Sequence, residues 1–229
     1  MSEHSDALDY VLSIAQTGTP VGDLQHALDA LLTTDRTEVE LADWRLRRGR
    51  LKKVCDEILP VTRLVRFLGE SNGHVRFPLD SKAPDCYWRR AQEGSPIGVE
   101  VTISQGRARH ILGTELVTAP RGSAVRGFLS LQDDAGKRMT EAAKRSSRAM
   151  YSTPQALAST GDGIRRCLRE KDHEKYRGMI LLIEAPLETL PAQRWQALQP
   201  ALREEAQRLP FQSVFVLGNG ERLPGLQLK

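Results

Sequence analysis

The feature that most constrains the fold is a change of hydrophobic period near residue 70. Before it, apolar residues recur every three or four positions, as on the buried face of a helix. After it come three short segments, residues 74–79, 85–90 and 98–104, which are rich in β-branched or aromatic side chains and separated by turn-forming residues. This order predicts helices followed by three consecutive strands in an antiparallel meander.

The helical part of the sequence contains a recognisable start signal. Thr37 followed by Glu40 is the signature of a capping box, which predicts a helix beginning there and continuing to Ile58. Pro60 is expected to kink or interrupt it, because proline cannot donate the intrahelical hydrogen bond. Two shorter helices are expected before it, so residues 1–36 are interpreted as an N-terminal helical extension of a domain that covers residues 37–229.

The second half of the sequence predicts helices and strands in alternation. Residues 105–131 fit either strands or loop arms. The later expectations are a helix over 153–168 broken at its two glycines, a buried strand over 179–185, a helix over 191–209 and a last strand over 212–218. A strand, helix and strand in this order imply a parallel crossover, so we expect an α/β fold with a mixed central sheet flanked by helices.

Length and composition restrict the class of protein. The chain has 229 residues, enough for one sizeable core, and its longest apolar run, at residues 179–183, is far too short to cross a bilayer. The N-terminus lacks the basic and apolar regions of a signal peptide, so a cytoplasmic location without membrane contact is expected. The three cysteines are widely spaced and predict neither a disulfide framework nor a metal site.

Most short catalytic motifs are absent from the sequence. It contains no P-loop, no GxSxG elbow and no HExxH helix, and its five histidines show no ligand spacing. The remaining candidates are the carboxylates of Asp85 and Glu100, fifteen residues apart. Because side chains alternate along a strand, Glu100 and Thr102 should share one face, opposite Val101, and Asp85 on a hairpin neighbour could approach them. Two close carboxylates repel each other unless a cation lies between them, and oxygen ligands suit Mg²⁺ or Mn²⁺.

These residues resemble the motif of the PD-(D/E)xK phosphodiesterase superfamily, which has the restriction-endonuclease-like fold. The matching residues are Pro84-Asp85 and then Glu100-x-Thr102 inside an apolar strand. The core of that family would correspond to residues 38–69, 74–104, 160–177 and 179–185. The resemblance implies a divalent ion, Mg²⁺ or Mn²⁺, held by Asp85, Glu100 and the backbone carbonyl of Val101.

The chain departs from the family where the motif has its lysine, because Thr102 is neutral. One explanation is that the lysine comes from the following helix, which makes Lys171 or Lys175 the first candidates and Lys144 a further one. Another is that Thr102 or Gln105 orients the attacking water as a polar group. The third is that the site is inactive and the fold serves binding alone. For the lysines, a solvated position on a helix is the simpler interpretation.

The resemblance implies a metal-dependent phosphodiesterase that acts on DNA. Glu70 or Glu57 could add a third carboxylate, although an ordinary surface position is the simpler interpretation of each. A densely basic segment could contact the phosphate backbone, and its cations are Arg45, Arg47, Arg48, Arg50, Lys52 and Lys53. The alternative is a catalytically inactive nuclease-like protein that binds nucleic acid, or binds a protein partner through its N-terminal helices in a defence or mobile-element complex.

Overall fold

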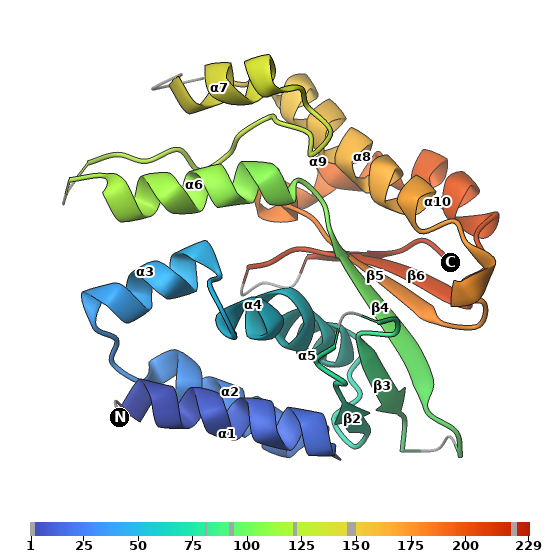
Figure 1. Cartoon of the computed structure of the whole chain (residues 1–229). Helices are drawn as coiled ribbons and strands as arrows, with labels where there is room; N and C mark the ends of the chain where they lie inside the picture. The colour runs from blue at the N-terminus through green and yellow to red at the C-terminus, as the bar shows by residue number, and fades with distance from the viewer. Residues whose placement is uncertain (1–2, 81, 92–93, 121–122, 146–149, 221–223) are drawn as a thin grey trace.

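The computed structural model describes residues 3–80, 82–91, 94–120, 123–145, 150–220 and 224–229 as an α/β fold around a seven-stranded mixed sheet (Figure 1). In spatial order the strands are β1 (Thr19–Pro20), β2 (His74–Arg76), β3 (Cys86–Arg89), β4 (Ile97–Ile103), β5 (Ile180–Glu184), β6 (Ser213–Leu217) and β7 (Gly225–Gln227). Strands β2, β3 and β4 form the predicted antiparallel meander, and β4, β5 and β6 are parallel. The expected parallel crossover is therefore confirmed.

Helices cover both faces of this sheet. One face is covered by α1 (Glu3–Thr17), α2 (Val21–Thr33), α4 (Leu51–Lys53), the π-helical turn η1 (Val54–Ile58) and α5 (Leu59–Phe67). The other is covered by α8 (Thr153–Glu170), the short turns η2 (Glu174–Tyr176) and η3 (Leu187–Thr189), α9 (Ala192–Gln196) and α10 (Gln199–Gln207). Beyond the end of β4, α3 (Glu38–Leu46) lies against α6 (Gly106–Thr118), and α7 (Lys137–Arg145) follows on the far side of α6 (Figure 1).

Strand alternation divides the apolar side chains between two cores. On β5, Ile180 and Leu182 pack with α1, α2 and α5, whereas Leu181 and Ile183 pack with α8 and α10. Every residue of this strand is buried, which explains its apolar run from Ile180 to Ile183. The first core also contains residues from α1 and α2, so the N-terminal helices share their apolar surface with the sheet.

The helix expected over residues 38–58 is instead two helices. The capping box predicted at its start is present, because the Thr37 and Glu40 side chains each bond the other's backbone N–H. Helix α3 nevertheless ends at Leu46, since Arg47 adopts a left-handed conformation with φ 53°, as does Gly49 with φ 54°. From Leu51 the chain stays helical to Phe67, and Pro60 lies in the first turn of α5, directly after the π-helical turn η1.

Three further expectations from the second half of the chain are corrected. The first part of the ambiguous segment is helix α6, whose buried Ala108 and Ile111 face a small separate core. Helix α8 runs without a break through Gly161 and Gly163, and the absence of a side chain at Gly163 lets the helix approach Ser104 closely. The helix expected over 191–209 is split into α9 and α10. None of the described helices has both the length and the apolar character needed to cross a membrane.

Candidate functional site

The candidate site lies where β3 stops pairing with β4. Strand β3 begins at Cys86, which pairs with Val99. Asp85, one residue before the strand, therefore lies opposite Glu100. There the Asp85 Oδ2 atom accepts a hydrogen bond of 2.8 Å from the backbone N–H of Val101. The carboxylate thus replaces the missing ladder bond, which fixes Asp85 between the two strands as they separate.

Glu100 lies on the face of β4 that turns toward α8, as the alternation predicted. Val99 and Val101 belong to the opposite core. Helix α8 ends at Glu170, and the next residue, Lys171, places its Nζ atom 2.5 Å from Glu100 Oε1. Both side chains are mostly buried, with exposed fractions of 20% for Lys171 and 7% for Glu100.

Of the three lysines considered from sequence, Lys171 is the one that contacts a motif carboxylate in the described part of the chain. Burial alone would lower its pKa, but the hydrogen bond and negative charge of Glu100 outweigh burial and raise the pKa. Lys171 therefore stays protonated. Lys175 packs over the ring of Tyr176, and Lys144 pairs with Glu141 on α7.

The neutral candidates both contact α8, although Thr102 also lines the pocket that contains Asp85. Thr102 Oγ1 lies 3.9 Å from Cys167 Sγ of α8. Gln105 is buried and donates from Nε2 to the carbonyl and hydroxyl oxygens of Ser159. Its amide group is already engaged in packing α8 against the end of β4.

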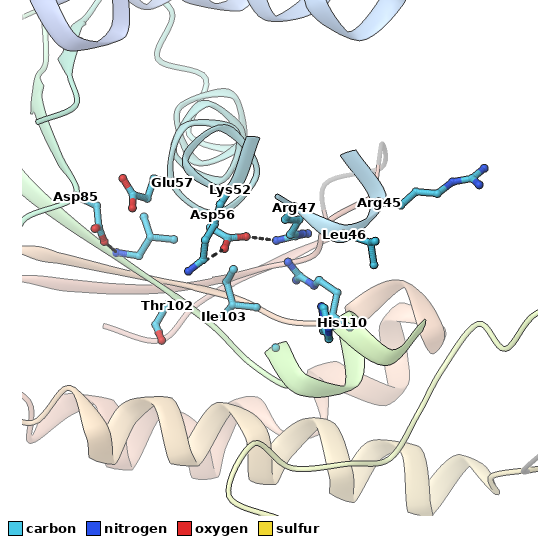
Figure 2. Close-up of a pocket in the computed structure, with 13 residues that line it drawn as sticks. Arg45, Leu46, Arg47, Lys52, Asp56, Glu57, Asp85, Thr102, Ile103 and His110 are labelled. Atoms are coloured by element: carbon cyan, nitrogen blue, oxygen red, sulfur yellow. Dashed lines mark hydrogen bonds and ion pairs between the residues drawn. The ribbon is translucent and has the colours of Figure 1, made fainter. Parts of the chain in front are cut away.

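Asp85 opens into a cavity of about 460 Å³ between η1, the end of β4 and the first turns of α6. Figure 2 shows Glu57 of η1 beside Asp85 at one end of this cavity. One oxygen of Glu57 pairs with Lys53 Nζ at 2.6 Å, and Lys53 also donates to the carbonyl of Asp80. Glu57, which sequence reasoning ranked behind the motif residues, is thus a half-buried member of the site. Glu70 instead pairs with Arg90, 3.3 Å away.

Burial raises the pKa of Asp85 to about 7. The hydrogen bond from Val101 opposes this increase, whereas the negative charges of Glu100 and Glu57 add to it and the positive charge of Lys171 reduces it. Burial also raises the pKa of Glu57, against the effect of Lys53. The negative charges of Glu100 and Glu57 therefore both act on Asp85, and a positive charge beside it would be stabilised.

The described side chains near Asp85 supply only part of the ligand set that a metal ion needs. Within the described residues, no group of three His, Cys, Asp or Glu side chains converges as a metal site would require. The Glu57 Oε2 and Glu100 Oε2 atoms are nevertheless buried and have no hydrogen-bond partner in that part of the chain. Mg²⁺ is usually bound by one or two carboxylates and keeps several waters, so each of these oxygens has the chemistry of a single ligand, Glu57 from the η1 side of β4 and Glu100 from the α8 side.

The basic segment is largely engaged in contacts within the chain. Arg47 pairs with Asp56, and Arg50 pairs with Asp9. Arg45 donates to the carbonyl of Leu116, and Arg48 pairs with Asp43. Lys52 pairs with Asp56, and Lys53 pairs with Glu57. The sequence therefore overstates the unpaired charge of this segment. Arg45, Arg47 and Lys52 line the cavity that contains Asp85.

A second buried carboxylate, Glu184, escaped the sequence analysis. It ends β5, has a side chain 2% exposed, and is surrounded by Arg47, Arg63 and Arg109. The Arg63 Nη1 atom lies 3.1 Å from Glu184 Oε2, and Arg109 of α6 pairs with the other oxygen. The only sequence signal was a glutamate at the end of an apolar run, which does not identify its partners.

Comparisons with known proteins add no functional information. No protein-family model matches the chain, and neither the curated proteins nor the solved structures gave a significant match. The fold established by the structure is α/β with a seven-stranded mixed sheet.

Proposed function

We propose that the chain is a metal-dependent phosphodiesterase that acts on DNA, with a restriction-endonuclease-like core. The observation on which this depends is that Asp85 interacts with Glu100 and Glu57, each of which has a buried oxygen without a partner in the described residues. The order of a helical segment, the β2–β4 meander, α8 and parallel β5 supports the same family.

The side chains of Asp85 and Glu100, with the backbone carbonyl of Val101, would hold Mg²⁺ or Mn²⁺, and Glu57 offers a further oxygen. Such an ion supplies an activated water and stabilises negative charge on a phosphodiester. Lys171 holds Glu100 in place and provides the positive charge that Thr102 lacks. Because Lys171 is protonated, it acts in this proposal by orienting groups and stabilising charge, and it does not accept the proton of the water.

The alternative is a catalytically inactive protein of the same fold that binds nucleic acid or a protein partner. One observation favours it: Lys171 already neutralises Glu100, and Asp85 already accepts a hydrogen bond from Val101. In this case the carboxylates stabilise the separation of β3 and β4, and no ion is needed.

Cleavage of supercoiled plasmid in Mg²⁺ or Mn²⁺ tests the proposal. We expect wild type to nick the plasmid, and Asp85→Asn and Glu100→Gln to lose at least a hundredfold in rate, because each loses a charged ligand of the ion. Glu174→Gln, which changes an exposed carboxylate paired with Arg177, is the matched control and should cleave like wild type. Equal rates in wild type and both site variants would refute catalysis by these residues.

A further inference from the structure

The cavity beside Asp85 has two chemically different ends. Figure 2 shows Asp85 and Glu57 at one end, and Arg45, Arg47 and His110 at the other. Its volume of about 460 Å³ lies within the range of roughly 300–1,000 Å³ typical of small-molecule sites, so it exceeds what one ion needs. The basic end therefore has room for a ligand group of its own.

The basic end is rigidly built around Glu184. Arg109, from α6, and Arg63, from α5, both contact this carboxylate, and Arg47 lies near it at 3.9 Å. Arg47 also pairs with Asp56, which Lys52 approaches to 3.9 Å. Cations outnumber carboxylates in this cluster, and the fixed guanidinium groups leave the surplus positive charge in a concave place.

One donor of the cluster lacks an acceptor within the described residues. The Nη1 atom of Arg109 is buried and makes no hydrogen bond within the described residues, while its Nη2 atom pairs with Glu184. Arg109 lines the cavity, as does Arg47. A buried donor left without a partner is costly, and a guanidinium presents paired donors that match phosphate oxygens.

We infer that this end of the cavity, built by Arg47 and Arg109 around Glu184, binds a phosphate group of a nucleic-acid strand. The inference rests on the proposed function, because the strand's neighbouring phosphate then lies at the Asp85 end. Phosphate contacts of this kind position a strand and do not read its sequence. A free nucleotide offers the same chemistry and must be distinguished by experiment.

The test is binding without metal, in EDTA at constant ionic strength. Inorganic phosphate, thymidine 5′-monophosphate and a short fluorescent single-stranded oligonucleotide are titrated into wild type and Arg109→Lys. The lysine keeps the charge beside Glu184 but loses the spare N–H donor, so oligonucleotide binding should weaken roughly tenfold. Arg89→Ala, which removes an exposed cation of β3 outside the cavity, is the control and should bind like wild type.

A second variant covers the case in which Arg109→Lys does not fold. Lys52 lines the same cavity with a side chain 69% exposed, so Lys52→Ala changes the basic end without disturbing Glu184. It should weaken oligonucleotide binding about threefold and reduce the salt dependence of binding. Wild-type affinity in Lys52→Ala and in folded Arg109→Lys would overturn the inference.

The outcomes also separate this inference from the proposed function. Phosphate binding that depends on Arg109, without any metal-dependent cleavage, would support the phosphate site and contradict only the enzyme. Cleavage with no effect of Arg109→Lys on binding would contradict only the phosphate site. A mononucleotide that binds as tightly as the oligonucleotide would overturn the strand as ligand.

Discussion

Replacement of Asp85 by asparagine should stabilise the metal-free protein at alkaline pH. Asparagine keeps an oxygen that can accept the hydrogen bond from Val101 but removes the charge that burial, Glu100 and Glu57 disfavour. At about 1.4 kcal/mol per pH unit, a pKa that rises from 3.8 to about 7 means that folding disfavours the charged form of Asp85 by roughly 4 kcal/mol. Because Asp85 is only partly buried, we expect Asp85→Asn to raise the free energy of unfolding at pH 8 by about 2–4 kcal/mol.

The direction in which stability changes with pH follows from proton binding. Between pH 4 and pH 7 the folded state retains on Asp85 a proton that the unfolded chain has released, so the stability of wild type falls as pH rises through this window. Urea unfolding in EDTA should therefore show a small difference between wild type and Asp85→Asn at pH 4.5 and the full difference at pH 8. Asp35→Asn, at an exposed loop position, is the control. No gain at pH 8, or an equal gain at both pH values, would refute the reasoning.

Three further changes test the local structure by urea unfolding. Lys171→Met should cost about 3 kcal/mol by leaving Glu100 buried and unpaired, and adding Glu100→Gln should restore most of it; no recovery would contradict the pairing. Gly163→Ala should cost about 1–3 kcal/mol, because its Cβ would clash with Ser104 Oγ, whereas a Cβ at Gly161 meets the flexible ends of Leu198 at 3.3 Å and Arg165 at 3.5 Å and should cost less. Thr37→Ala should cost about 1 kcal/mol through loss of the capping box, and an unchanged midpoint would show that the cap contributes nothing.

The sequence predicted best what depends on local pattern. The capping box at Thr37, the three-stranded meander and the shared face of Glu100 and Thr102 all follow from spacing within a few residues. Lys171 was one of several candidates, because sequence does not show which lysine after α8 reaches a strand 71 residues earlier.

What sequence missed depends on contacts between distant segments. The α8 helix tolerates Gly161 and Gly163 because its neighbours pack closely there, which no local propensity reveals. The break after α3 requires Arg47 in a left-handed conformation, which arginine rarely adopts and which accompanies its pairing with Asp56. Glu184 acquires its three arginines from the turn after α3, from α5 and from α6, so its burial was not predictable from its own neighbours.

The central claim, that Asp85 and Glu100 bind one divalent ion, is tested most directly by diffraction from crystals grown with Mn²⁺. Anomalous density is expected at about 2.1 Å from an oxygen of each carboxylate, and it should disappear in Glu100→Gln crystals under the same conditions. Crystals of wild type with no anomalous density at this place, and with Lys171 still paired to Glu100, would contradict the claim.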